Sequence, residues 1–238
     1  MKNFRDFGLD NVRKGVFFRG EAISKLSNKD KTLLFKENNI KVVIDLRSIQ
    51  EKESKPDFIP NGVSYYHLPF LDMLEMGSNS EKEAKKEILK THKLPDMHRY
   101  YTLFVSKDKR ESWTKIFELL LTNEGPFYFH CTAGKDRTGT LAALLLALLG
   151  VDKDKIVLDY LETNKHTVFP FAYRVFALTL DKETRKEFKT YIYAKEEYLD
   201  TLFLEINRIY GSLEGFYKDC CGLDEDKIKA LKNKYLAK

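Results

Sequence analysis

The chain has 238 residues, of which 41 are Lys or Arg and 36 are Asp or Glu, so its formal net charge is +5 at neutral pH. This mild excess suits anionic substrates. The sequence shows no basic stripe with interleaved aromatic residues, however, so we expect no nucleic-acid partner. The length is sufficient to bury a sizeable core and falls within the range of one domain. The 3 cysteines lack paired spacing, which indicates a reducing compartment.

The amino-terminal residues contain no apolar segment typical of a signal peptide. The sequence therefore predicts a cytoplasmic protein and leaves export without a standard signal peptide open. The apolar run at 141–149 is far too short to span a membrane, because about 20 apolar residues are needed. We therefore expect no integral membrane segment, and the oligomeric state is left open.

Short apolar runs at 16–19, 41–46, 63–67 and 127–130 predict strands, whereas the stretches 28–37 and 112–121 predict helices. After Asp152, a candidate N-cap, the sequence predicts mostly helix. One long amphipathic helix should run over 195–210, with its apolar face in the core. These elements predict a single α/β domain over residues 1–238 with added helices.

Residues 76–93 form a separate, highly charged stretch. A polar run at 77–80 leads into residues 81–87, which predict a helix. Such a segment is usually a solvated helix on the protein surface. A second interpretation, that this segment forms a lid, follows only from a resemblance to a known family.

The ten residues from His130 to Gly139 read His-Cys-Thr-Ala-Gly-Lys-Asp-Arg-Thr-Gly and are the most informative part of the sequence. Five residues separate Cys131 from Arg137, which is enough to curl the backbone around a tetrahedral oxyanion with its N–H groups inward. The strand at 127–130 precedes this loop, and an Ala- and Leu-rich helix follows it. The loop therefore lies at a helix N-terminus, where the helix dipole favours a bound anion and a cysteine thiolate.

The residue types of the loop indicate phosphate chemistry. The planar fork of Arg137 can hold two phosphate oxygens and stabilise the charge of an in-line transition state. Thr138 can donate a hydrogen bond to the sulfur of Cys131, and His130 either orders the loop or is an ordinary buried histidine. The predicted phosphate-binding residues are Thr132, Ala133, Gly134, Lys135, Asp136 and Arg137.

Two other kinds of site do not fit these residues. A nucleotide-binding P-loop is excluded, because Phe129 stands where its first glycine would fall and Asp136 follows the lysine. None of the 5 histidines forms a metal-ligand pattern, so we expect no metal.

The loop resembles that of the Cys-X5-Arg protein tyrosine phosphatase superfamily, and more narrowly that of a bacterial group with the sequence Cys-X-X-Gly-Lys-Asp-Arg-Thr-Gly. The resemblance implies a tyrosine or dual-specificity phosphatase-like α/β fold, with a central, mostly parallel sheet flanked by helices. Gly20 departs from the family, which usually has Ser after Phe-Arg, and this weakens the transfer of a role to Arg19. The other similar segments are Asn3-Phe4-Arg5-Asp6 with Gly8, Phe18-Arg19, Asp45-Leu46-Arg47-Ser48, Asp159-Tyr160 with Asn164, and Tyr210-Gly211-Ser212-Leu213-Glu214-Gly215-Phe216.

The resemblance also implies a helical lid that would span about 76–107 and shield the thiolate from oxidants. Tyr100 and Tyr101 would supply its aromatic wall. Asp72 and Asp96, in and near this segment, are interpreted as cap or turn residues.

Two aspartates are candidates for the general acid. Many tyrosine phosphatases carry it in a Trp-Pro-Asp loop, but the only tryptophan here, Trp113, is not followed by proline. The resemblance indicates Asp136. Confinement beside phosphate favours the protonated form of its carboxyl group, whereas Lys135 and Arg137 favour the ionised form. Asp45 is the alternative acid, because it ends a strand that should neighbour the loop.

Together these observations predict a phosphomonoester hydrolase that acts through a phosphocysteine on Cys131, with no metal and no organic cofactor. The predicted substrate is phosphotyrosine, extending to phosphoserine and phosphothreonine. A phosphoinositide is the alternative, because Lys135 can pair with the additional phosphates of an inositol ring. A third hypothesis is an inactive phosphate-binding module, against which the intact Cys131, Arg137 and Thr138 argue. The expected partner is accordingly a phosphorylated protein or a phosphoinositide.

Overall fold

The computed structural model describes residues 1–70, 81–166 and 171–237. Within these residues, five strands form one sheet in the order β1-β2-β5-β3-β4. Strand β1 is antiparallel to β2, and all the other neighbours are parallel. The strands are β1 (Arg5–Asp6), β2 (Phe17–Gly20), β3 (Val42–Asp45), β4 (Ser64–His67) and β5 (Phe127–His130). The four predicted strands are confirmed, and β1 is too short to give a periodic signal.

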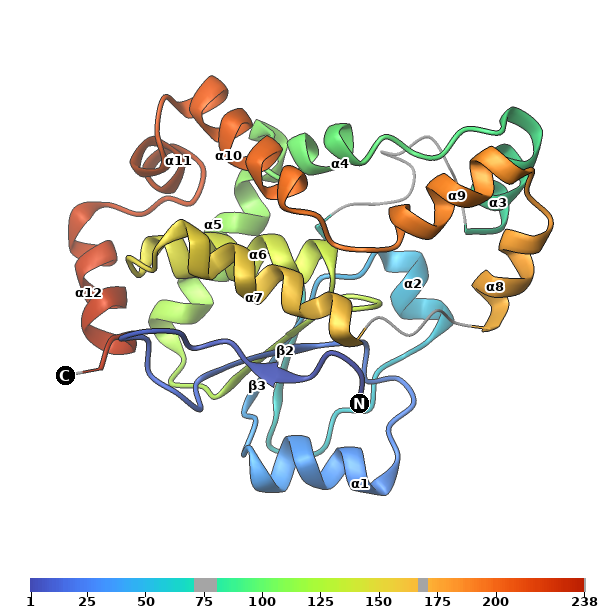
Figure 1. Ribbon diagram of the computed structural model, residues 1–238. Helices are drawn as coiled ribbons and strands as arrows, with labels where there is room; N and C mark the ends of the chain where they lie inside the picture. The colour runs from blue at the N-terminus through green and yellow to red at the C-terminus, as the bar shows by residue number, and fades with distance from the viewer. Residues whose placement is uncertain (71–80, 167–170, 238) are drawn as a thin grey trace.

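The two faces of the sheet carry different layers, because successive side chains of a strand point to opposite sides. One face contributes to the main core, and the other packs on a small cluster with Ile23 and Leu34. Figure 1 shows helix α1 (Asn28–Lys31) on the second side, opposite the other labelled helices. The residues of the main-core face are Phe17, Val42, Ile44, Phe127 and Phe129, and those of the other face are Phe18, Val43 and Tyr128.

The helix predicted over 28–37 exists in two parts, α1 and a π-helical turn, η1 (Thr32–Glu37). The wider turn closes with a hydrogen bond from the amide of Asn38 to the carbonyl of Leu33. The helix predicted over 112–121 is confirmed as α5 (Arg110–Thr122). Asp152 directly precedes α7, and its carbonyl accepts from the amides of Lys155 and Ile156. Further helices are α2 (Ile49–Ser54), α4 (Met97–Leu103), η3 (Lys107–Lys109), α6 (Asp136–Leu148), α7 (Lys153–His166), α10 (Glu196–Tyr210), α11 (Leu213–Asp219) and α12 (Glu225–Tyr235).

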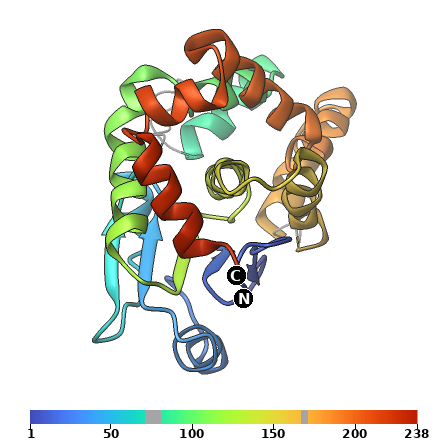
Figure 2. The same ribbon diagram turned by 90° about the vertical axis from the view of Figure 1, so that its left-hand side faces the viewer.

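Helix α6 is the central helix of the molecule. Its residues from Thr138 to Leu146 are all buried, as expected for a helix that is apolar all round. Figure 1 shows α7 beside it, and Figure 2 shows helices on several sides of this pair. The amphipathic helix predicted over 195–210 is α10, whose buried residues include Leu199, Leu202 and Ile206.

A second group of helices lies at one end of the molecule (Figure 1). It consists of α3 (Glu81–Thr91), α8 (Phe171–Leu178) and α9 (Lys182–Tyr191), which we call the α3–α8–α9 cluster. Ile88, Phe176 and Phe188 form part of a small core of its own. The helix expected after residue 80 is thus confirmed, whereas 76–80 and Asp72 lie outside the described residues. None of the helices in the described ranges is both long and apolar enough to cross a membrane.

Candidate active site

The predicted phosphate loop connects the end of β5 to the first turn of α6. Cys131 directly follows β5 and is 3% exposed. The loop continues to Lys135, and α6 begins at Asp136. The expected placement of a cysteine at the N-terminus of a buried helix is therefore confirmed.

The carbonyl groups of the loop point away from its centre, because each has a hydrogen-bond donor outside. The carbonyl of Thr132 accepts from the amide of Ala22 at 3.2 Å. Asn3 Nδ2 donates to the carbonyl of Gly134 at 2.9 Å and to that of Ala133 at 3.3 Å. In the described part of the chain, the amides of 132–135 have no protein acceptor. Such a row of free N–H groups is the nest that an oxyanion requires.

A buried network of ion pairs holds this loop in place. Arg19 is fully buried and donates from Nη2 to the carbonyl of Gly134 at 3.0 Å. Its Nη1 donates to Asp159 Oδ2 at 2.7 Å, and Arg5 Nε donates to Asp159 Oδ1 at 2.8 Å. Burial alone would raise the pKa of Asp159, but Arg19 and Arg5 outweigh it and lower that pKa. Arg19 therefore contacts the phosphate loop although Gly20 follows it.

Two glycines allow these segments to approach closely. Gly134 has a φ of 68°, and a Cβ there would lie 2.2 Å from the carbonyl oxygen of Gly20. A Cβ at Gly20 would in turn lie 2.4 Å from Tyr128 Oη. The hydroxyl of Tyr128 donates to the carbonyl of Glu21 at 2.6 Å. The Tyr128 side chain thus occupies the space that a side chain at Gly20 would need.

Glu51 in α2 holds the side chain of Arg137. Its two carboxylate oxygens accept from Nη1 and Nη2 of Arg137, at 2.5 and 2.9 Å, and the hydroxyl of Thr132 also donates to Glu51. No hydrogen bond within the described residues uses Arg137 Nε. The Nε–Nη2 side of the guanidinium is consequently available for two oxygens of a phosphate.

Glu51 was missed by sequence reasoning, although a signal was present. Ser48 and Glu51 form a capping box, in which Glu51 Oε2 accepts from the amide of Ser48 at 2.9 Å. Ser-X-X-Glu can be recognised in a sequence as a helix start, but its contact with a distant arginine cannot. Burial alone would raise the pKa of Glu51, whereas Arg137 and Thr132 together lower it to about 2.

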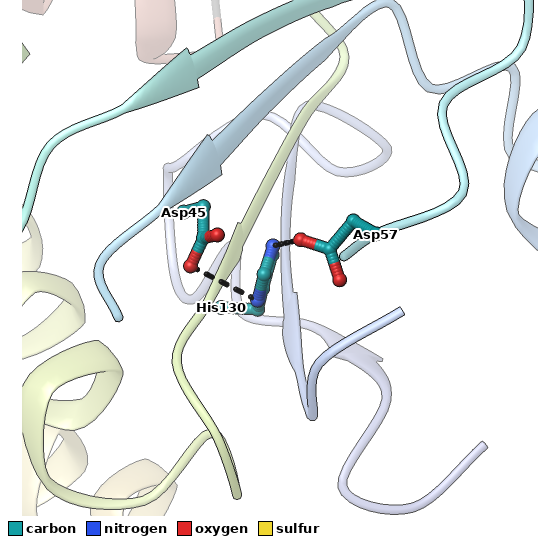
Figure 3. A group of neighbouring side chains, drawn as sticks. All are labelled: Asp45, Asp57 and His130. Carbon is teal, nitrogen blue, oxygen red and sulfur yellow. Dashed lines mark ion pairs between the residues drawn. The ribbon is translucent and has the colours of Figure 1, made fainter. Parts of the chain in front are cut away.

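Asp45 lies in a buried cluster on the α1 side of the sheet (Figure 3). Arg47 donates to both of its oxygens, from Nε at 2.9 Å and from Nη2 at 2.8 Å, and Tyr65 donates to Oδ2 at 2.7 Å. Burial opposes ionisation of Asp45, but the hydrogen bonds from Arg47 dominate and hold its pKa well below the usual range. A carboxylate held in this way has no proton to donate. The geometry therefore argues against Asp45 as the general acid.

His130 lies between Asp45 and Asp57 in Figure 3, with Nε2 at 3.2 Å from Asp57 Oδ2 and Nδ1 at 3.7 Å from Asp45 Oδ1. The position fits the interpretation of His130 as an ordering residue at the base of the loop. The three side chains are close enough together to ligate a metal ion. Arg47 Nη2, however, lies 2.8 Å from Asp45 and 2.6 Å from Asp57. The guanidinium of Arg47 thus pairs with both carboxylates of the cluster.

Asp136 and Lys135 connect the phosphate loop to α4 and to the end of α9. Tyr101 Oη donates to Asp136 Oδ1 at 2.8 Å, so a tyrosine of the predicted lid segment binds the proposed acid. Tyr100 is partly exposed, and the charges of Arg137, Asp136 and Cys131 act on it. Asp96 caps α4 through a bond from the amide of Arg99, as expected of a cap residue.

Lys135 contacts the α3–α8–α9 cluster. Its Nζ donates to the carbonyls of Ile192 and Tyr191 at the end of α9, at 3.1 and 3.4 Å. Lys135 Nζ also lies 3.5 Å from Asp136 Oδ1. The side chain of Lys135 therefore joins the phosphate loop to the end of α9, which lies outside the segment predicted as the lid, 76–107.

Thr138 is fully buried, and its Oγ1 has no hydrogen-bond partner among the described residues. Its expected bond to the thiolate of Cys131 therefore stays a prediction. A buried hydroxyl without a hydrogen-bond partner lowers the stability of the fold by about 1–3 kcal/mol. A functional role for Thr138 would account for this cost.

A loop of inward amides, a buried cysteine and a clamped arginine define a cysteine-dependent phosphatase. The sequence model of the tyrosine phosphatase family matches residues 1–237, and the chain belongs to this family of phosphatase enzymes. It is 28% identical over 264 residues to the triple specificity protein phosphatase PtpB of Mycobacterium tuberculosis, covering 97% of this chain and 95% of that protein.

Two further similarities are partial or distant. A putative tyrosine-protein phosphatase of Cupriavidus necator is 36% identical over 110 residues, which cover 46% of this chain and 39% of that protein. The solved core catalytic domain of the PP-IP phosphatase SIW14 from S. cerevisiae has a TM-score of 0.40 and 15% identity. That similarity covers 80% of this chain and 93% of the solved one.

Proposed function

We propose that this enzyme hydrolyses phosphotyrosine, and more slowly phosphoserine and phosphothreonine, through a phosphocysteine on Cys131. The amides of 132–135 and the Nε–Nη2 side of Arg137 bind the phosphate oxygens. Asp136 protonates the leaving oxygen, and the Thr138 hydroxyl supports the sulfur as a leaving group when water attacks. The single observation that carries this proposal is the loop itself, with its carbonyls bonded outward around the buried Cys131.

Phosphoinositides are the second substrate class. Lys135 is a second cation in the phosphate loop, and its side chain is 12% exposed. A multiply phosphorylated ring offers further oxyanions for this cation. The similarity to a phosphatase named for triple specificity supports a broad substrate range.

The chain works as one phosphatase domain, in which the α3–α8–α9 cluster and α4 serve as the lid of the site. The bond from Lys135 Nζ to the end of α9 supports this assignment. So does the reciprocal pair of bonds between Asn164 and Ala194, at 2.7 and 2.8 Å, which fixes the chain after α9 onto α7.

Replacement of the nucleophile is the direct test of the mechanism. Cys131→Ser should abolish turnover of an aryl phosphate while phosphate-ester binding stays measurable, because only the nucleophile is lost. Cys220→Ser, at a buried free cysteine elsewhere in the core, is the matched control and should keep its activity. More than a trace of turnover by Cys131→Ser would overturn the phosphocysteine.

A panel of substrates tests the proposed substrate class. Specificity constants kcat/KM should be measured for phosphotyrosine, phosphoserine and phosphothreonine peptides and for phosphoinositides in mixed micelles. We expect the highest value for a phosphotyrosine peptide. A higher value for a phosphoinositide would make the second class the principal one.

A further inference from the structure

The carboxylate of Asp136 is held by two buried tyrosines from other helices. Tyr101 Oη in α4 lies 2.8 Å from Asp136 Oδ1 and 2.6 Å from Tyr160 Oη in α7. Tyr101 is fully buried, and Tyr160 is 1% exposed. A chain of two hydrogen bonds thus links α7 and α4 to the carboxylate of Asp136 in α6.

The direction of these two hydrogen bonds follows from the number of protons. A carboxylate oxygen only accepts, so Tyr101 donates its single proton to Asp136 Oδ1, and Tyr160 must donate to Tyr101. Burial, and after it the charge of Asp136, raises the pKa of both tyrosines. Both hydroxyls therefore keep their protons, and the chain of bonds runs from Tyr160 through Tyr101 to Asp136.

Both aromatic rings are fixed by packing. The Tyr101 ring stacks on that of Tyr198 in α10, with centroids 5.3 Å apart and planes at 24°. The Tyr160 ring lies against Gly139 in the phosphate-loop motif, where an added Cβ would be 2.8 Å from Tyr160 Cδ2. The glycine that ends the motif thus makes space for the tyrosine that begins the chain of bonds.

The second carboxylate oxygen, Oδ2, differs from the first. Tyr101 and Lys135 Nζ, the latter at 3.5 Å, both lie near Oδ1. Within the described residues no hydrogen bond or ion pair involves Oδ2. A protonated Asp136 would therefore carry its proton on Oδ2, while Oδ1 stays bonded to Tyr101.

We propose that Tyr101 and Tyr160 are positioning residues that orient Asp136 and stabilise the charge it acquires in the reaction. This proposal rests on the proposed role of Asp136 as general acid. As the S–P bond forms and the P–O bond breaks, the Oδ2 proton passes to the leaving oxygen and Asp136 becomes a carboxylate. The hydrogen bond from Tyr101 strengthens as that charge develops, so it stabilises the transition state more than the bound substrate.

The test compares two leaving groups on the same enzyme. Phenyl phosphate needs an acid, whereas p-nitrophenyl phosphate has a stable leaving phenolate and needs it little. Tyr101→Phe should reduce kcat roughly tenfold more on phenyl phosphate, which is the scale of one hydrogen bond to a charged group. Tyr160→Phe should also reduce kcat more on phenyl phosphate, but by a smaller factor, because Tyr101 still donates to Asp136. The ratio of the two rates does not depend on the folded fraction of a variant.

Tyr217→Phe is the matched control. This buried tyrosine donates to the carbonyl of Leu144, further along α6, at 2.8 Å. The Tyr217→Phe variant loses a buried hydroxyl that does not contact Asp136. Its ratio of kcat on phenyl phosphate to kcat on p-nitrophenyl phosphate should therefore equal that of the unmodified enzyme. Equal slowing of both substrates by Tyr101→Phe, or no slowing, would overturn the proposal.

The pH dependence of kcat provides a second readout. Loss of a donor disfavours the ionised carboxyl group, so in Tyr101→Phe the fall of kcat with rising pH should move to higher pH. In an Asp136→Asn background, Tyr101→Phe should add no leaving-group selectivity, because the acid is already absent. If Asp136→Asn itself slows both substrates equally, the proposed acid is wrong. If Asp136→Asn is selective and Tyr101→Phe is not, only the positioning role fails.

Discussion

At the scale of the residue, the site is organised before a substrate arrives. The guanidinium of Arg137 is held by Glu51, and the loop carbonyls are held by Asn3 and Arg19. Donors fixed in this way need no reorganisation during the reaction, which is the principal advantage of a preorganised anion site. The sequence predicted the contiguous loop, because Cys131 and its neighbours form one motif. It did not predict Glu51, because spacing carries no information on contacts between distant segments.

Glu51→Gln tests the importance of the held arginine. The amide keeps the size of the side chain but removes its charge and one acceptor, so Arg137 loses part of its orientation. We expect kcat/KM for an aryl phosphate to fall roughly tenfold to a hundredfold, as for the loss of a charged hydrogen bond. Glu53→Gln, an exposed position in the same helix, should have no effect. Unchanged kcat/KM in Glu51→Gln would show that the arginine does not need its partner.

At the scale of the element, strong apolar patterns were the reliable signals. The runs that became β2, β3 and β5 are buried throughout and mostly apolar, as buried parallel strands are, and α6 and α10 follow clear helical patterns. The apolar pattern did not indicate the π-helical turn η1, nor that α4 would bring Tyr101 to Asp136. Helix α9 ends at the phosphate loop, where Lys135 binds its last carbonyls. A cation at a helix C-terminus also interacts favourably with the helix dipole.

Lys135→Met tests this connection between α9 and the loop. The methionine keeps much of the length but has no donor, so the carbonyls of Tyr191 and Ile192 lose their partner. We expect amide hydrogen exchange in α9 to accelerate severalfold, because the local opening free energy falls by about 1 kcal/mol. Exchange in β5 should not change. Lys234→Met is the control, since Lys234 Nζ binds carbonyls at the end of α5, and it should leave α9 unaffected. Unchanged exchange in α9 of Lys135→Met would contradict the connection.

At the scale of the whole molecule, buried carboxylates pair with buried arginines, and one of these networks joins α7 to the amino-terminal segment. Asp159 in α7 binds Arg5 and Arg19 near the amino terminus, and Asp45 binds Arg47. The family resemblance singled out several of these residues, but the ion pairs themselves required the sheet order, which brings β2, β5 and β3 side by side. Because ion pairs of this kind carry fixed protonation states, they make the stability of the fold depend on pH.

The fold should lose stability in acid. The pKa values of Asp45, Glu51 and Asp159 are lowered in the folded chain from the ordinary values of 3.8 and 4.5. Below about pH 4.5 the unfolded chain therefore binds more protons than the folded one, so protonation favours unfolding. The free energy of unfolding should be nearly constant from pH 7 to 5 and should decrease steadily toward pH 2, as measured by urea denaturation.

Asp159→Asn isolates one of these contributions. Its stability at pH 7 should be about 3 kcal/mol lower, because two buried arginines lose their carboxylate. The difference from the unmodified protein should shrink as the pH falls, since protonation removes the same charge from both arginine contacts. Asp154→Asn, at an exposed position of the same helix, should follow the unmodified protein at every pH. A constant difference between Asp159→Asn and the unmodified protein down to pH 2 would mean that the carboxylate acts by its shape and hydrogen bonds, and not by its charge.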